Sequence, residues 1–358
     1  MERSKFYKFF PPPQFLQMPA VGLDISDTSM RFIELVEKRK AFVIGRFGER
    51  AIPRGIIESG EVKKPADLRA LFVALKKEYG LDFVTMSLPE EKAYLFDMHL
   101  PKMKQNDIRG AIELGLEDHV PLRADEALFD YDIEKETENG IEVSVSVVPR
   151  SLVDGYLEAF SGSGITPIAF EIEAQSLARA VVPEGDKHSY MIVDFGRTRT
   201  GIAVVSEGTV EFTSTILVGG DSLTEAIAKN MNISYDEAEK IKREKGISGI
   251  TENENLSLAM MSAVSILRDE VVKQQTYWQT HNDDYGKKRP TIQKVYLCGG
   301  DSNLAGFVEY LAQGLSVSVE LANTLVNVNT LDEYVPEVSF SDSLRFATAL
   351  GLALRRPR

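Results

Sequence analysis

Cysteine, histidine and long apolar runs are scarce in this sequence, and each shortage excludes a class of protein. The one cysteine, Cys298, rules out an internal disulfide and lies in an apolar run typical of a buried thiol. The four histidines are scattered without ligand spacing, which argues against a zinc site. No apolar run approaches the roughly 20 residues that cross a bilayer, and residues 1–19 lack a signal peptide's apolar region. A cytoplasmic protein is therefore expected.

Positive charge is also in short supply. The sequence has 41 Lys and Arg against 54 Asp and Glu, a formal charge of −13. Binding to nucleic acid or to anionic lipid needs a basic face, so neither is expected of the main body. Residues 1–19 are the exception, because lysines and aromatic residues precede three prolines there. We expect this segment to be a flexible or self-docked tail, with contact to a membrane or partner as the alternative.

The length of 358 residues predicts more than one domain. Residues 20–25, 29–38 and 41–52 are rich in β-forming residues and predict three consecutive strands. A helix should begin at Pro65 and end at Gly80, because its apolar residues recur with helical period, and a strand should follow it.

The pattern changes between residues 92 and 168. A strand at 93–100, a helix at 106–120, strands at 127–134 and 141–148 that form a hairpin through Asn139 and Gly140, and a helix at 150–164 are expected there. This order predicts a small α+β insertion at 92–168. The domains expected around it are 20–91 with 169–190, and 191–358. Helices then alternate with short strands, which favours mixed α/β layers.

The pattern of the first three predicted strands repeats from residue 189, where three short β-rich runs again follow one another. Asp24 and Asp194 each end an apolar strand, and each is followed by small and hydroxyl-bearing residues. Backbone amides of such turns can cradle phosphate oxygens. An aspartate beside them can hold Mg²⁺, which combines a few carboxylates with phosphate oxygens. The expected metal ligands are Asp24 and Asp194, and the expected phosphate contacts are Ser26, Asp27, Thr28, Gly196, Arg197, Thr198 and Thr200.

The paired turns, followed by a strand that ends in Gly299 and Gly300, resemble the actin, Hsp70 and hexokinase superfamily. That resemblance implies a duplicated, ribonuclease H-like α/β fold that binds Mg²⁺ and ATP. Gly299, Gly300 and Ser302 would then meet adenosine, and Glu239 and Lys242 would contact ribose. For the last two, a solvated ion pair is the alternative. Residues 174–182 and 346–355 would be connecting helices, whose small residues allow close crossing.

The insertion is similar to the one found in FtsA and in the PilM family of type IV pilus assembly proteins. The order of elements, the helix at 234–246 and the turn after the third strand are most similar to the PilM family. This resemblance implies a scaffold at the cytoplasmic face of the inner membrane that binds the short tail of a PilN-like bitopic protein. Pilus assembly ATPases and further copies of the chain are other partners that it implies.

Ser26 and Asp27 depart from the glycine that the superfamily carries in the first turn, so we expect weak or absent ATPase activity. No catalytic residue is assigned. Glu173 is the one carboxylate considered for orienting a water, with a structural surface glutamate as the alternative.

Two other functions stay open on the sequence. One is an FtsA-like division protein that tethers a filament to the membrane, although no amphipathic helix follows the last core helix. The other is a small-molecule kinase using Asp130 or Asp132, although both alternate with apolar residues as solvated strand positions do.

Overall fold

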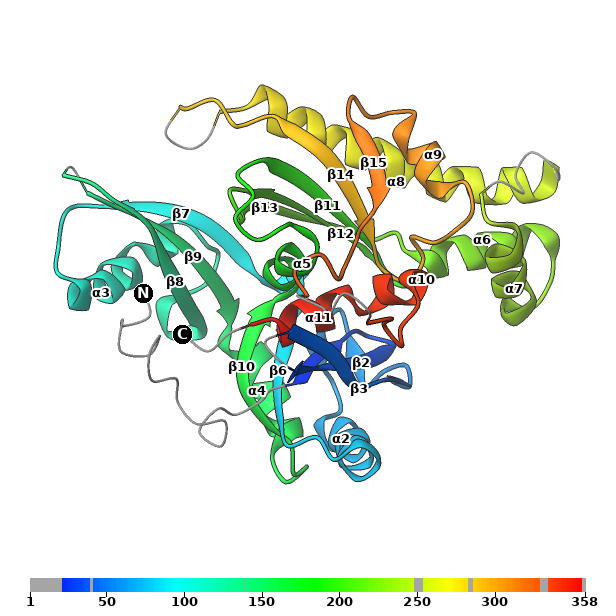
Figure 1. The fold of residues 1–358 in the computed structure, drawn as a ribbon, viewed down its shortest axis with the longest axis horizontal. Coiled ribbons are helices and arrows are strands. Elements are labelled where there is room, and N and C mark those ends of the chain that lie inside the picture. The colour runs from blue at the N-terminus through cyan, green and yellow to red at the C-terminus, as the bar shows by residue number, and fades with distance from the viewer. Residues whose placement is uncertain are drawn as a thin grey trace.

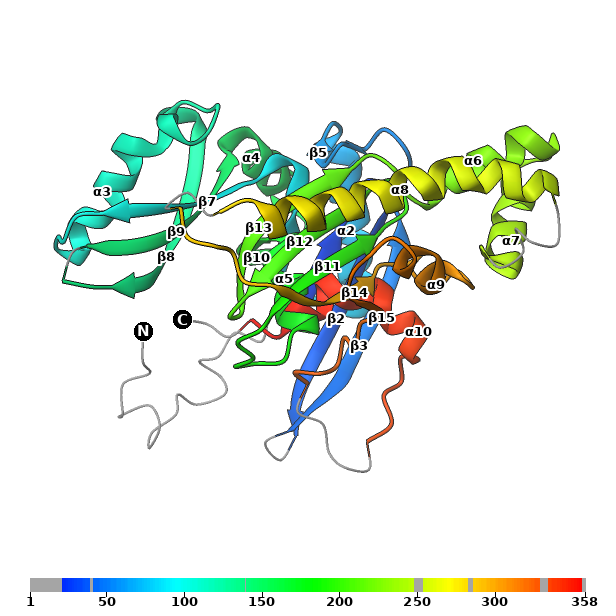
Figure 2. The ribbon, with the colours of Figure 1, turned by 90° about the horizontal axis from the view of Figure 1, so that it is seen from above.

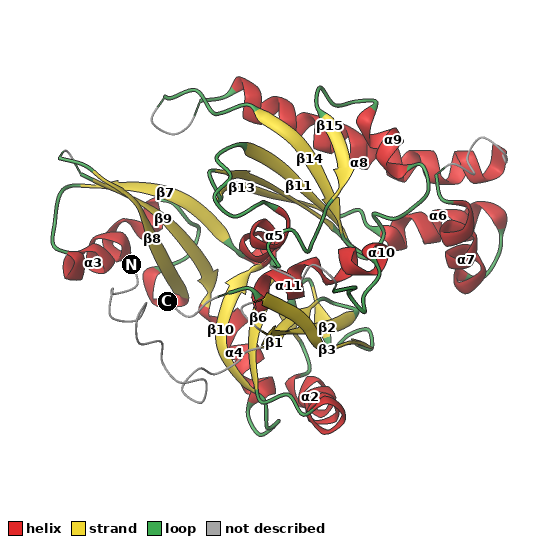
Figure 3. Ribbon diagram, viewed as in Figure 1, coloured by secondary structure: helices red, strands yellow, loops and turns green. Residues whose placement is uncertain are grey.

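The computed structural model describes residues 21–38, 41–138, 140–247, 254–282, 286–328 and 334–355. The expected tail at 1–19 and Asn139 of the expected hairpin lie outside the described residues. Two five-stranded sheets and one three-stranded sheet form the frame of the molecule (Figure 3).

The first large sheet has the strand order β10-β6-β1-β2-β3. Its strands are β1 (Val21–Ile25), β2 (Ser29–Lys38), β3 (Ala41–Ala51), β6 (Phe83–Leu88) and β10 (Thr166–Ile172). The first three are the predicted consecutive strands and pair antiparallel, while β6 and β10 run parallel to β1. A short hairpin of β4 (Ile57–Glu58) and β5 (Glu61–Val62) precedes helix α2 (Pro65–Tyr79). Helix α2 ends at Gly80 in a left-handed conformation, also as predicted.

The second large sheet repeats this plan in the order β13-β12-β11-β14-β15. Its strands are β11 (Ser189–Phe195), β12 (Thr200–Ser206), β13 (Thr209–Ile216), β14 (Ile292–Cys298) and β15 (Ser318–Leu321). Again three antiparallel strands are extended by two parallel ones. Four helices lie along the chain between the strands of this sheet: α6 (Gly220–Met231), α7 (Tyr235–Lys245), α8 (Glu254–Thr280) and α9 (Phe307–Ala312). Elements packed on the first and second sheets are called the first half and the second half below.

The three-stranded sheet has the order β7-β9-β8 and forms a separate unit with its own core. It consists of β7 (Tyr94–Leu100), β8 (Ala127–Glu136), β9 (Ile141–Pro149) and helix α3 (Gln105–Gly115). Its apolar strand residues alternate toward α3, as the sequence predicted. Figures 1 and 2 show this unit at the opposite end of the molecule from α6 and α7.

Helix α4 (Arg150–Phe160) was expected inside the insertion, but it packs elsewhere. Leu152 and Tyr156 join α2 in the core of the first half, where the Phe160 ring stacks on Phe72. Strand β10, which follows α4, is also part of the first sheet. The packing therefore favours a boundary of the inserted unit near Pro149 instead of residue 168.

Two helices cross between the large sheets: α5 (Glu173–Val181) and α11 (Ala347–Ala353) (Figure 1). A Cβ at Gly351 would lie 1.8 Å from the Ser176 carbonyl oxygen, and one at Gly22 would lie 1.9 Å from that of Ala349. Glycine is therefore required at both contacts. The predicted close crossing of these helices is confirmed, and a short helix α10 (Phe340–Ser343) and a 3-10 turn at Leu344–Phe346 lead into α11.

None of the helices within the described ranges is both long enough and apolar enough to span a membrane.

Candidate functional site

The two predicted phosphate turns lie at equivalent places in the two halves. The first joins β1 to β2 at Ser26–Thr28, and the second joins β11 to β12 at 196–199. The strand carbonyls close each turn, since Ser29 accepts from the Ser26 amide at 2.8 Å and Arg199 from the Gly196 amide at 3.1 Å. Within the described residues, the amides of Asp27, Thr28, Arg197 and Thr198 have no hydrogen-bond partner. Unpaired amides in a turn fit the cradle that a phosphate group requires.

Asp24 and Asp194 stand at the ends of the strands that lead into these turns. Asp24 is only 8% exposed and accepts a hydrogen bond from the Ser87 hydroxyl at 2.9 Å. Burial raises the pKa of Asp194 to about 6, and the nearby Asp24 carboxylate adds to this effect. Burial likewise raises the pKa of Asp24, against the opposing charge of Arg31. The Asp24 charge therefore disfavours the ionised form of Asp194, and a cation bound beside both groups would relieve this repulsion.

A metal ion at this place would need ligands from a bound molecule. Across the ranges that the structure describes, no three acidic, histidine or cysteine side chains gather in a way that could hold a metal ion. Mg²⁺ accepts this arrangement readily, because it binds one or two carboxylates together with phosphate oxygens and water. The residues present thus fit a magnesium nucleotide, with Asp24 and Asp194 as its carboxylates. Bound Mg²⁺ would neutralise phosphate charge there.

The Ser26 and Asp27 side chains of the first turn bind backbone groups of the first half. Asp27 accepts hydrogen bonds from the amides of Ser59 at 3.1 Å and Gly60 at 2.9 Å, in the turn between β4 and β5. The Ser26 hydroxyl donates to the Ser29 carbonyl at 3.1 Å, and the Thr28 carbonyl accepts from the Ile52 amide. Asp27 was predicted to contact phosphate, and in the structure its carboxylate binds the turn between β4 and β5.

The second turn is held by its own half. The Arg197 guanidinium lies 2.8 Å from the Asp221 carboxylate, and the Thr200 hydroxyl donates to the Val218 carbonyl at 2.7 Å. Thr200 is fully buried, which leaves Thr198 as the hydroxyl nearest the unpaired amides. A Cβ at Gly196 would lie 2.9 Å from the Arg199 carbonyl oxygen, so glycine keeps this turn tight.

Glu239 and Lys242 form a buried network, not the solvated ion pair that was the alternative. Lys242 is 1% exposed, and its Nζ lies 2.9 Å from both Glu239 and Asp301 and 3.1 Å from the Gly220 carbonyl. Burial alone would raise the pKa of Glu239, but hydrogen bonds from Thr224 and Lys242 bring it to about 2. The pair links α7 to the start of α6 and to the loop after β14. Its predicted contact with ribose stays a prediction.

The glycines after β14 differ in what surrounds them. Gly299 has φ +94°, and a Cβ there would lie 2.4 Å from the Asp194 carboxylate. Gly300 is open, since its Cβ would only make ordinary contact with Arg345 at 3.7 Å. The Ser302 hydroxyl is buried and donates to the Gly299 carbonyl at 2.7 Å. Space for a ligand is therefore left at Gly300, while Gly299 and Ser302 shape the loop.

Sequence reasoning missed Arg199, the last residue of the second turn. Its Nε is 3.0 Å from Glu91 and its Nη2 is 3.4 Å from Glu173, the first residue of α5. Burial raises the pKa of Glu173 to about 8, although the Arg199 charge opposes this. The alternative of a surface glutamate at position 173 is therefore wrong. The signal available in the sequence was a cation directly before Thr200, inside a turn expected to bind phosphate.

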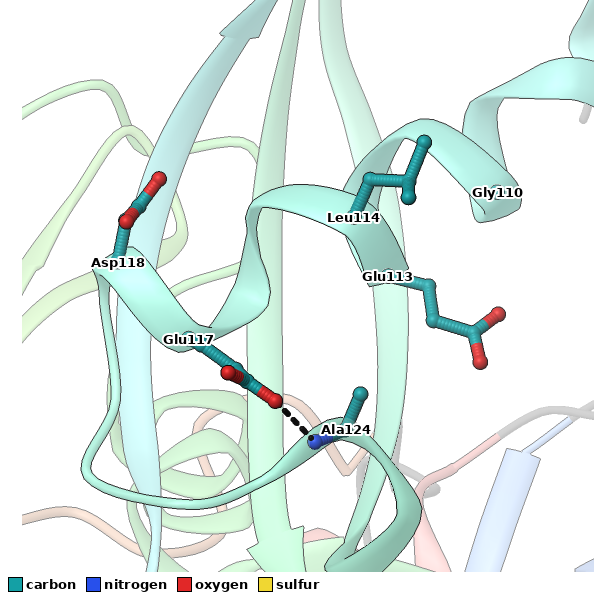
Figure 4. A pocket seen from close by; sticks show the side chains of 6 residues that line it. All are labelled: Gly110, Glu113, Leu114, Glu117, Asp118 and Ala124. Carbon is teal, nitrogen blue, oxygen red and sulfur yellow. Dashed lines mark hydrogen bonds between the residues drawn. The ribbon is translucent and has the colours of Figure 1, made fainter.

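A separate pocket of about 530 Å³ lies on the inserted unit (Figure 4). It is lined by α3 and the segment after it, with Glu113, Leu114, Glu117 and Asp118 among its residues. The Glu117 carboxylate accepts from the Ala124 amide at 3.2 Å. No lining residue belongs to either turn, so this pocket is not part of the predicted nucleotide site.

Comparison with known proteins gives one family match. The family model described as type IV pilus assembly protein PilM matches residues 22–357. A solved structure described as a PilM-PilN type IV pilus biogenesis complex has a TM-score of 0.79 at 23% identity, and the match covers 94% of this chain and 98% of that chain.

Other proteins are similar to this chain in sequence or in structure. The cell division protein FtsA of Enterococcus hirae is 21% identical over 84% of this chain and 77% of its own length. The ethanolamine utilization protein EutJ of Carboxydothermus hydrogenoformans has a TM-score of 0.56 at 18% identity, covering 94% of this chain and 89% of EutJ. An AMPPNP-bound MreB of Spiroplasma citri has a TM-score of 0.50 at 11% identity, covering 92% and 93%. These similarities confirm the predicted actin-like α/β fold.

Proposed function

The chain belongs to the family of the type IV pilus assembly protein PilM, and from this premise we propose that it is a nucleotide-binding scaffold of a type IV pilus assembly platform. Its partner would be the short cytoplasmic tail of a PilN-like bitopic membrane protein. The family match over residues 22–357, together with the likeness to the fold of a PilM-PilN complex, carries this proposal. Recruitment to the cytoplasmic face of the inner membrane would then occur through the partner.

The nucleotide proposed for the cleft is ATP with Mg²⁺. Four unpaired amides in two turns and the paired carboxyl groups of Asp24 and Asp194 support it. Turnover is expected to be weak, because Glu173, the carboxyl group considered for orienting water, pairs with Arg199 and has a pKa raised by burial to about 8. A general base must be free to accept a proton.

A peptide-binding measurement tests the scaffold function. The fluorescently labelled cytoplasmic tail of the PilN-like protein from the same cells is titrated with the purified chain, and anisotropy is recorded with and without Mg²⁺ and a non-hydrolysable ATP analogue. Saturable binding is expected for the native tail and not for a peptide of scrambled order. Equal binding of both peptides, or of neither, would contradict the proposal.

The likeness to FtsA supports a second candidate, a division protein that tethers a filament to the membrane. Affinity capture from the native cells after gentle membrane solubilisation separates the two functions. Pilus inner-membrane proteins in the eluate would support the scaffold, whereas division proteins would support the second candidate. The match of the PilM family model to nearly the whole chain favours the scaffold.

A further inference from the structure

The Arg199 side chain leaves its own half of the molecule and enters the other. Its Nε lies 3.0 Å from Oε2 of Glu91, its Nη2 lies 3.4 Å from Oε1 of Glu173, and its Nη1 lies 3.9 Å from Oδ1 of Asp27. Glu91 follows β6, Glu173 begins α5, and Asp27 is in the first turn. The Arg199 guanidinium of the second half therefore contacts carboxylates in three segments, each of which follows a strand of the first sheet.

These contacts are largely shielded from water. The Arg199 side chain is 12% exposed, and the three carboxylate side chains are between 13% and 19% exposed. Burial opposes the charge of Arg199, but Glu173, Glu91 and Asp27 outweigh it and raise the pKa of the guanidinium. Charges in such a site balance only one another, and removing one partner leaves an uncompensated buried charge. The cluster therefore favours one arrangement of the two halves.

The backbone of Arg199, in contrast, is fixed to the second half. Its carbonyl accepts from the Gly196 amide at 3.1 Å, and a Cβ at Gly219 would lie 2.6 Å from its amide nitrogen. The residue also directly follows the unpaired amides of Arg197 and Thr198. Any movement between the halves would therefore change the contacts of the Arg199 side chain, because its backbone stays with the second half.

We propose that Arg199 is the positioning residue that couples nucleotide binding to the arrangement of the two halves. This inference rests on the nucleotide site proposed above. With the cleft empty, the guanidinium is shared among Asp27, Glu91 and Glu173. With phosphate groups at the turns, Arg199 divides its hydrogen bonds between them and the acidic side chains, because the oxygens of both accept from its fork of donors. The hold on Glu91 and Glu173 then weakens, and the halves change position.

Distances between the halves test this coupling directly. Lys77 on α2 and Lys229 on α6 are exposed, so Lys77→Cys and Lys229→Cys provide one spin label in each half. Cys298 can stay, because it is fully buried and burial raises the pKa of its thiol. Pulsed electron paramagnetic resonance then gives the distance distribution with and without Mg²⁺ and AMP-PNP.

Three further variants complete the experiment. Arg199→Gln removes the charge, and Arg199→Lys keeps the charge but loses the fork of donors. Lys294→Gln is the matched control, because Lys294 pairs with Glu320 at 2.9 Å within the second sheet. Trp278 is buried in the core of the second half, so its fluorescence verifies that each variant is folded.

In the unmodified and Lys294→Gln proteins, we expect a narrow distribution that shifts when AMP-PNP binds. We expect Arg199→Gln to give a broader distribution without nucleotide and no further shift with it, and Arg199→Lys to lie between. An Arg199→Gln distribution identical to that of the unmodified protein would overturn the inference. A fluorescent ATP analogue separates the two failures: no binding overturns the nucleotide site itself, whereas binding without a distance change overturns only the coupling.

Discussion

Glu173 is a carboxyl group whose ionisation is opposed by its surroundings. It lies at the start of α5, and burial raises its pKa from 4.5 to about 8. The folded state therefore holds this proton more tightly than the unfolded chain does. As pH rises from about 4.5 to about 8, the folded state loses up to about 1.4 kcal/mol of stability per pH unit from this group alone.

Glu173→Gln is expected to remove that pH dependence. The variant's free energy of unfolding should fall less steeply between pH 5 and about 8 than that of the unmodified protein, as measured by urea denaturation at several pH values. Glu158→Gln, at an exposed position on α4, is the control. Parallel pH profiles for Glu173→Gln and the unmodified protein would show that Glu173 is not titrating in this range.

Asp27 stabilises a turn that lies far from it in the sequence. Its carboxylate accepts from the amides of Ser59 and Gly60. Asp27→Ala leaves both donors without their partner, which is expected to cost about 1–3 kcal/mol of unfolding free energy. Asp27→Asn keeps one acceptor oxygen and should cost less. Equal stability of all three proteins in a denaturant titration would contradict this role.

The sequence located the turns but not what their side chains do. Asp24, Asp194 and the strands leading to them could be predicted, because apolar runs that end in a polar turn are local patterns. The partners of Asp27 and Arg199 could not, since Ser59, Gly60, Glu91 and Glu173 are brought there only by the assembled fold. Burial of Lys242 has the same cause, because Asp301 and Gly220 reach it from other segments.

Among the elements, α5 and α11 depend on small residues where they cross. Gly351 of α11 meets the backbone of Ser176, so Gly351→Ala is expected to destabilise the protein by about 1–3 kcal/mol or more through overpacking. Gly110 on α3 has no atom within 4 Å of a built Cβ. Gly110→Ala should therefore stabilise by about 0.5–1 kcal/mol through its better helix propensity. Urea unfolding of both variants measures the contrast, and a shift of the same sign in both would count against it.

Most elements could be predicted from period and turn residues, as the antiparallel strands and α2 illustrate. The errors concern packing partners and breaks. Helix α4 looks like part of the insertion because it directly follows β9, yet its apolar face fits α2. The sequence also did not reveal the 3-10 turn at Leu344–Phe346, whose residues Leu344 and Phe346 pack in two different clusters.

At the scale of the whole molecule, α11 comes late in the chain but completes the first half. Leu350 is fully buried in a cluster with Ile33 and Ile44 of β2 and β3. Leu350→Ala is expected to lower the free energy of unfolding by about 2–5 kcal/mol, since it leaves a cavity there. Native-state hydrogen exchange should show a greater loss of amide protection in β1 and β2 than in β14. An equal loss in all three strands would indicate that both halves open as one unit.

The contact between α11 and β1 also constrains folding during synthesis. Strand β1 leaves the ribosome early, while the helix that covers it, with the Ala349 carbonyl against Gly22, is made after both sheets. Domains commonly fold in the order of their synthesis. Here the first half must wait with one face of its sheet open until α11 has been made.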